Sequence, residues 1–542
     1  MDFAVYPYSR GTLLDLLSDG SISPEPELTR DYIAEHKSLH LRYFDDYFEE
    51  LGAKSVIVEY EYIDRDFLED YAAYYVRCFR NLRKKCVRLH FLRTKLDAQK
   101  FEILLTEVGA DSAPANLPDG DYLGFIVVRP LPDALFGRTC VRTYPAECSD
   151  GDTRHFPVAR QYDLSLFGLT QSVNTLAFQE QDTVAAACAS SALWSAFQAT
   201  CKLYGHEALS PIEVTRRATQ YYRGIGRPVP SRGLAPHEMI RAIRDVGLES
   251  HTYQLLAPDT DESAVKALIY AYSKMGAPVI LGLHLFDTSK HKYEGAHAVT
   301  VAGYRLTAKS PVSSDNTRFH SDRLVKVYVN DDHIGPFARM EFTSDACKEK
   351  DILIESFKAT QQYLGDNLVV LTTSWGIESG FSVVAVPDLA MIPVYHKIRI
   401  EMPAIAGCVQ ELDERIIRWC NWVLSPGKAN AAGYEWDVFL DTVSGFRNDI
   451  RGRHDIDSNL KAVLLTTQMP RFLWRAIGYD GERRMIELLF DATGVERSRF
   501  FLRAIVYDVS LGNLLRAVVR SKSQLSEPFR SPQIDWILDS FT

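Results

Sequence analysis

The sequence predicts an α+β protein of several domains. Its 542 residues exceed what a single hydrophobic core organises. Segments with strand-like and helix-like periodicity both occur along the whole chain, and a turn-rich, polar stretch marks a boundary near residue 150. We therefore expect three domains: residues 1–150, residues 151–386 and residues 387–542.

The N-terminal region alternates between the two kinds of element. Strands are expected at 55–60, 86–92 and 122–128, with helices at 64–78 and 96–108 between them. This βαβαβ order predicts an α/β domain in which helices cover a small parallel or mixed sheet. No glycine-rich phosphate loop follows these strands, so we assign the domain no chemistry and expect a regulatory or recognition role.

The middle region contains a cysteine placed as a nucleophile would be. A polar turn at 179–182 runs into a helix of small residues that holds Cys188 near its start. The unpaired N–H groups and positive dipole of a helix N-terminus stabilise a thiolate. The alternative is a small buried core residue, since cysteines in alanine-rich helices are commonly that.

Two later strands carry the groups that a thiol nucleophile needs. Residues 295–304 read as a strand holding His297, and residues 327–332 read as a strand that ends in Asp331 and Asp332. Nucleophile, base and acid thus follow one another in the order of a Cys–His–Asp triad. Because side chains alternate along a strand, we expect Asp331 to face the histidine and Asp332 to face away, towards the next turn.

Three helices and a strand lie between the cysteine and the histidine. The helices are expected to begin near Ser210, Gly233 and Asp261, and the strand covers 279–283. From about residue 175 to 340 this layout resembles a papain-like cysteine peptidase, closest to the bacterial C39-like branch. The resemblance implies two lobes, with the cysteine heading the central helix of one and the histidine and acid on adjacent strands of the other.

Carried over to this chain, the resemblance implies Cys188 as nucleophile, His297 as general base, Asp331 as the orienting carboxylate and Gln181 as an oxyanion donor. In the family the glutamine usually stands six residues before the cysteine.

That position holds Asp182 here, and Gln179 is a second candidate for the oxyanion donor. Ala189 follows the cysteine where the family often has glycine or tryptophan. A long polar connection, 305–323, separates the histidine and acid strands; we interpret it as a surface loop, a lid or a docking element.

The C-terminal region shows no motif. Strands at 367–372 and 381–386 are expected to complete the middle sheet. A helix with one apolar face covers 409–423, and a further helix at 485–490 and a strand at 500–508 are expected. We interpret 387–542 as an α+β domain of unknown role.

Composition excludes several function classes. A net charge of −10 disfavours a nucleic-acid binder. We interpret the local basic run at 77–88 as a solvated helix end, with an anion or nucleotide sensor as the alternative. Nine cysteines without short paired spacings indicate reduced thiols and no zinc motif. No signal peptide or membrane span is evident, so we expect a cytoplasmic protein with no metal and no cofactor.

The sequence therefore predicts an intracellular cysteine hydrolase, a peptidase acting through a thioester, whose partner is a protein or peptide substrate. The alternatives are a deamidase, an acyltransferase or a transglutaminase-like enzyme on the same triad, and an inactive papain-like binding or scaffolding module. The large flanking domains lead us to expect gating by a regulatory protein or small ligand.

Overall fold

The computed structural model describes most of the chain. The described residues are 3–22, 25, 27–79, 82–107, 117–118, 120–182, 187–220, 233–257, 260–290, 292–308, 317–343, 368–375, 383–423, 433–495, 499–521 and 530–541. They form two compact units. The first unit comprises residues 1–260, 276–305 and 326–393, and the second comprises 261–275, 306–325 and 394–542. This division does not test whether the three predicted domains fold independently, so their boundaries remain predictions.

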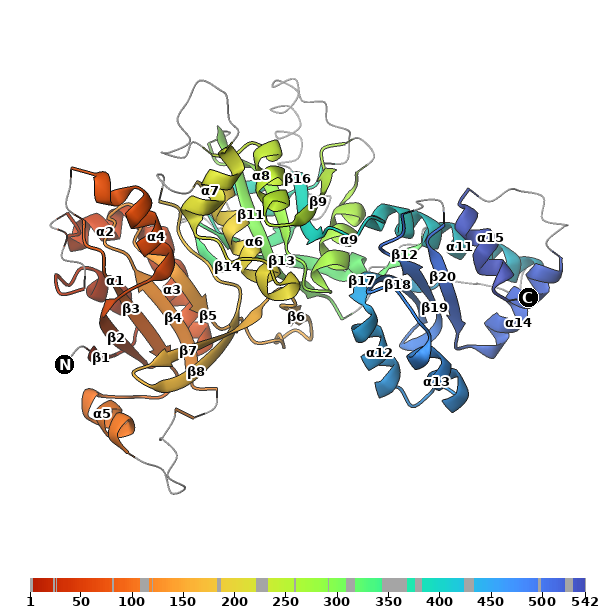
Figure 1. The fold of residues 1–542 in the computed structure, drawn as a ribbon, viewed down its shortest axis with the longest axis horizontal. Helices are drawn as coiled ribbons and strands as arrows, with labels where there is room; N and C mark the ends of the chain where they lie inside the picture. Colours follow the sequence, from red (N-terminus) through yellow and green to blue (C-terminus); the bar gives the residue numbers. More distant parts are fainter. Residues whose placement is uncertain are drawn as a thin grey trace. The chain divides into compact units, whose positions relative to one another are not determined.

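The first unit begins with a five-stranded sheet (Figure 1). Its strands follow one another in spatial order: β1 (Phe3–Pro7), β2 (Ser55–Tyr62), β3 (Cys86–Leu92), β4 (Tyr122–Val128) and β5 (Phe136–Val141). All four pairings are antiparallel. The expected parallel or mixed sheet is therefore wrong. Each helix between strands is an excursion that returns to the same end of the sheet, instead of a crossover to the opposite end.

Helices cover both faces of this sheet. They are α1 (Thr12–Leu17), α2 (Arg30–His36), α3 (Ser38–Leu51), α4 (Arg65–Ala73), the 3₁₀ turn η1 (Tyr75–Arg77) and α5 (Ala98–Thr106). In β2, Val56 and Val58 join one core with α1, α2 and α3, whereas Ile57 joins the other with α4 and α5. This alternation is the two-residue period of a strand buried on both faces.

The second of these cores continues into the helices of the middle region. After β6 (Thr153–His155) and the hairpin β7 (Arg160–Leu166) and β8 (Leu169–Thr175) come α6 (Cys188–Tyr204), α7 (Pro211–Thr219) and α8 (Pro236–Asp245). Trp194 and Phe197 of α6 are fully buried in the same cluster as Ile57. The N-terminal sheet and the helix that begins at the cysteine therefore share one core.

A closed antiparallel barrel forms the rest of the first unit. Its strands are β10 (Val279–Asp287), β11 (Lys292–Leu306), β13 (Leu324–Asp331), β14 (Gly335–Phe342), β15 (Leu371–Thr372) and β16 (Val383–Tyr395), with β9 (Leu248–Gln254) added beside β16. Pairing of β10 with both β11 and β16 closes the ring. The described parts of the two strands expected after the middle region, β15 and β16, do lie in this sheet.

The second unit is built on another five-stranded sheet, in the order β12, β17, β18, β19, β20. Its strands are β12 (Arg318–Phe319), β17 (Glu435–Thr442), β18 (Phe472–Asp480), β19 (Arg483–Asp491) and β20 (Phe501–Val506). Its helices are α9 (Glu262–Ser273), η2 (His320–Arg323), α11 (Met402–Val423), α12 (Val443–Gly452), α13 (Ser458–Thr466), α14 (Val509–Arg520) and α15 (Pro532–Asp539).

Two expectations change in this unit. The predicted helix at 485–490 is wrong, because these residues lie in β19, paired on both sides. A six-residue apolar run has no distinguishing period, and here the tertiary pairing decides the structure. The polar connection 305–323 contributes β12, which pairs with β17, and η2; residues 309–316 within it lie outside the described part of the chain.

Candidate active site

Cys188 is the first residue of α6. No side chain caps this helix in the described structure, and the first intrahelical bond runs from the Ser191 amide to the carbonyl of Ala187. The amides of the first turn are therefore available beside the sulfur. Twelve residues of α6 are buried, and small ones near its start, such as Ala189 and Ala192, allow β11 to approach so closely that the Thr300 hydroxyl donates to the Ala192 carbonyl at 2.7 Å.

His297 lies on β11 and links the cysteine to an acid. The His297 ring lies beside the Cys188 thiol, and hydrogen bonding to that thiol is one cause of the raised pKa of His297. His297 Nε2 lies 3.0 Å from Asp331 Oδ1, and both side chains are buried. Because Nε2 faces the acid, Nδ1 is the nitrogen left for the thiol. The structure thus brings Cys188, His297 and Asp331 together in the predicted order.

Trp375 is a neighbour that the sequence analysis missed. Its Nε1 donates to Asp331 Oδ2 at 2.8 Å, and its ring meets the His297 ring edge-on with centroids 5.3 Å apart. The His333 amide donates to Asp331 Oδ1 at 3.1 Å. Both oxygens of Asp331 are therefore engaged, and Trp375 contacts both the histidine and the acid.

Asp332 does not face away from the histidine, contrary to the expectation. Its Oδ1 lies 3.6 Å from His297 Nε2, and the residue is 4% exposed. The pairing of β13 with β14 shifts register between Val329 and Asp331, so strict alternation ends just before the two acids. Neither carboxylate oxygen of Asp332 has a hydrogen-bond partner among the described residues.

Asn330, which precedes the two acids, still follows the alternation of side chains along β13. Asn330 points to the opposite side, where its Nδ2 donates to Ser195 Oγ at 2.8 Å and its Oδ1 accepts from the Phe337 amide at 3.2 Å. This side chain ties the acid strand to the middle of α6, the helix that begins at the nucleophile.

Burial and the ion pair between His297 and Asp331 determine the pKa values of the site. Burial opposes the protonation of His297, but the charge and hydrogen bond of Asp331 and the hydrogen bond of Cys188 raise its pKa well above the usual 6.5. Burial likewise opposes ionisation of Asp331, yet the charge and hydrogen bond of His297 hold its pKa at about 2. Burial raises the pKa of Asp332 to about 7. The site therefore holds one firmly ionised acid and one that carries a proton below neutrality.

The candidate oxyanion donors occupy different surroundings. Gln181 Nε2 lies 3.0 Å from His333 Nε2, which links this residue to the ring that packs beside His297. Gln179 is buried, and its Nε2 has no partner in the described structure. Asp182 is also buried and accepts from the Tyr75 hydroxyl at 2.8 Å. Residues 183–186 lie outside the described part of the chain.

Helix α3 holds the hairpin that carries the acids. His40 Nε2 donates to the Asp332 carbonyl at 3.1 Å, and the Tyr43 hydroxyl donates to the Pro336 carbonyl. Between these contacts, Gly335 has a φ of 154°, and an added Cβ would lie 2.5 Å from the Tyr43 ring. Only glycine fits this close approach of helix and hairpin.

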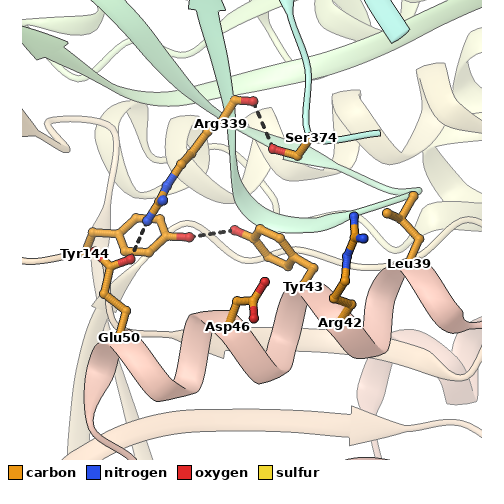
Figure 2. A pocket seen from close by; sticks show the side chains of 8 residues that line it. All are labelled: Leu39, Arg42, Tyr43, Asp46, Glu50, Tyr144, Arg339 and Ser374. Atoms are coloured by element: carbon orange, nitrogen blue, oxygen red, sulfur yellow. Dashed lines mark hydrogen bonds and ion pairs between the residues drawn. The ribbon is translucent and has the colours of Figure 1, made fainter. Parts of the chain in front are cut away.

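Figure 2 shows the same contact further along α3, around a small polar cavity of about 150 Å³. Glu50 forms an ion pair with Arg339 of β14, and the Arg339 guanidinium lies 4.4 Å from the centroid of the Tyr144 ring. The Ser374 hydroxyl donates to the Arg339 carbonyl at 3.2 Å. Ser374 precedes Trp375, so α3 supports both the hairpin and the tryptophan.

One cluster has donors suited to a metal ion. Ligand atoms of His297, Asp332 and His333 lie within 4.8 Å of one another. Asp331 engages His297 Nε2 and Gln181 engages His333 Nε2, so an ion bound through either of these nitrogens would have to displace that contact. The described geometry therefore fits a hydrogen-bonded triad better than a metal centre.

Comparison with models of known protein families and with curated proteins finds no match for this chain. Among the described residues, no helix combines the length and apolarity that crossing a membrane requires.

Proposed function

We propose that the protein is a cysteine hydrolase that cleaves an amide bond through a thioester acyl-enzyme. The observation that carries the proposal is the chain of contacts from Cys188 through His297 to Asp331, with the sulfur at an uncapped helix N-terminus. The combination of a central helix with a closed barrel supports a papain-like arrangement of two lobes. A buried structural cysteine would need neither the ion pair nor the supporting acid.

The residues divide the chemistry between them. His297 accepts the thiol proton, and the Cys188 thiolate attacks the amide carbonyl carbon, whose oxygen takes up negative charge. First-turn amides of α6, with Gln181 or Gln179, stabilise that charge. The tetrahedral intermediate collapses with cleavage of the C–N bond, and His297 returns its proton to the leaving amine. Water activated by His297 then attacks the thioester, releasing the acid and the thiol.

Asp331 and Trp375 act through His297. The ionised carboxylate fixes the ring so that Nδ1 faces the sulfur, and it stabilises the imidazolium that forms in each half-reaction. The Trp375 N–H holds the second oxygen of that carboxylate, and its ring packs against the histidine.

Incubation with a diverse peptide library, followed by mass spectrometry of new amine termini, tests this proposal. Full-length protein and a Cys188→Ala variant are compared, and neutral hydroxylamine is added to trap a thioester as a hydroxamate. New termini that depend on Cys188 are expected. A one-dalton mass gain with the chain intact would indicate a deamidase instead, and the absence of any Cys188-dependent product and hydroxamate would refute the proposed hydrolase.

A further inference from the structure

A second polar cavity lies in the first unit, away from the residues of the triad. Its volume is about 440 Å³, within the range of small-molecule sites. It opens where the segments that follow β3 and β5 meet the exposed face of the β7–β8 hairpin. Its polar lining consists of Arg93, Arg142, Thr143, Gln161, Ser172 and Asn174.

The two arginines are held in place through their stems. Arg142 Nε donates to the Tyr122 carbonyl at 3.0 Å, and Arg93 Nε donates to the Leu51 carbonyl at 2.9 Å. Arg93 Nη1 also donates to the Gly120 carbonyl at 3.3 Å, which leaves Nη2 as its terminal nitrogen for a ligand. Within the described structure, the terminal nitrogens of Arg142 make no hydrogen bond and Arg142 forms no ion pair. A guanidinium fixed at Nε with free terminal nitrogens presents its fork to a planar or tetrahedral anion.

Among the described residues that line the cavity, none is a carboxylate that could neutralise these charges. Burial and the neighbouring charge of Arg93 lower the pKa of Arg142. The acid nearest in the hairpin is Asp163, opposite Ser172, and it accepts from Gln161 Nε2 at 2.8 Å without lining the cavity. Two like charges facing an acid-free cavity are stabilised by an anionic ligand.

We propose that this cavity binds the phosphate group of a small phosphorylated molecule, such as a nucleoside phosphate. The fork of Arg142 and Nη2 of Arg93 take the phosphate oxygens, while Thr143, Ser172, Gln161 and Asn174 supply hydroxyl and amide groups for the rest of the ligand. The inference does not depend on the thiol chemistry, and it gives the N-terminal region a binding role.

Isothermal titration of the full-length protein with inorganic phosphate, pyrophosphate, AMP and adenosine, at constant ionic strength, tests the site. Saturable binding is expected for the three phosphate-bearing probes and not for adenosine. Arg142→Gln should weaken binding by about 10- to 100-fold, because it removes a charged hydrogen-bonding fork. Arg451→Gln, which removes an equal charge at an exposed residue of the second unit, serves as the matched control.

A second variant leaves both arginines in place. Asn174→Asp adds a carboxylate to the lining and should reduce phosphate binding as strongly as Arg142→Gln, with the thermal unfolding midpoint unchanged.

The proposal is overturned if AMP and adenosine bind equally, or if no phosphate-bearing probe saturates up to about 10 mM. Equal weakening by Arg142→Gln and Arg451→Gln would show a non-specific charge effect. A single-stranded RNA bound far more tightly than AMP would assign the surface to nucleic acid instead.

Discussion

Replacement of Asp331 by asparagine should separate the two adjacent acids by their effect on the nucleophile. The change keeps the shape of the side chain and removes the charge that faces His297. Burial opposes the ionisation of Asp331, but its contacts, chiefly with His297, lower its pKa from 3.8 to about 2, which corresponds to roughly 2 kcal/mol. Coupling is reciprocal, so the imidazolium of His297 should lose a comparable stabilisation.

The sign of the effect follows from the raised pKa of His297. The charged ring is favoured as long as the pH lies below that raised value, and there it stabilises the thiolate of Cys188. Without the acid the imidazolium loses this support, so the reactive form of the site should be less populated at low pH. At pH 5 this should slow alkylation by up to about 100-fold.

The assay needs no substrate. Low doses of iodoacetamide are applied between pH 5 and 8, and modification of Cys188 is followed by peptide mass mapping. Asp332→Asn is the matched variant. Because the pKa of Asp332 is raised to about 7, this acid is uncharged at pH 5, and its replacement should change the rate only above neutrality. If both variants slow alkylation equally at pH 5, with circular dichroism unchanged, the assignment of roles to the two acids is refuted.

Three further outcomes are expected. Trp375→Phe keeps the ring and removes the donor to Asp331, so alkylation at pH 5 should slow about tenfold; an unchanged rate would mean that the indole N–H has no role. Prolonged dialysis against EDTA should leave that rate unchanged, because His297 is engaged by the acid; a loss that Zn²⁺ reverses would contradict this. In the second unit, Glu487→Gln should lower the free energy of unfolding by about 3 kcal/mol, measured by urea denaturation, because it leaves the buried Arg475 guanidinium, 2.7 Å from Glu487, without that partner. If the urea midpoint of Glu487→Gln shifts no more than that of a variant with an exposed Glu→Gln change, the remaining partners of Arg475 are enough to stabilise its buried charge.

Local patterns predicted the elements well where the chain itself determines them. The strands at 86–92 and 122–128 have the predicted bounds, because continuous apolar runs between turns have few other structures available. Strand direction was predicted wrongly, since the order of helices and strands does not determine whether a connection crosses the sheet or returns.

In the candidate site, too, local sequence features were predicted correctly and features that depend on tertiary contacts were not. The order of cysteine, histidine and acid along the chain was readable, and the structure places those side chains together. Trp375 was not readable, because it lies 44 residues beyond Asp331 and its role arises only from tertiary contact. Asp332 was misplaced because a shift in β-pairing has no signature in the side-chain pattern. His333 directly follows the two predicted acids in the turn after β13. That position was the only sequence signal that could have identified it as a neighbour of the site.

Helix α3 changes how the expected gating can be studied. A fragment of residues 150–386 would lose the His40 and Tyr43 contacts to the acid-bearing hairpin. Its inactivity would then report damage to the site, so regulation is better examined by point changes in the intact chain.

The route of the chain also bears on how such a protein can change over generations. The strands of His297 and Asp331 are adjacent in the barrel, yet residues 306–325, which connect them, belong to the second unit. Asp437 of that unit binds Tyr270 and Lys274, which come just before the barrel strand β10. A premature stop codon after residue 393 would therefore strip partners from residues 261–275 and 306–325, two segments of the second unit that lie in the sequence between strands of the first. We expect descendants to keep or lose the two units together, unlike proteins whose domains are joined end to end and exchanged freely.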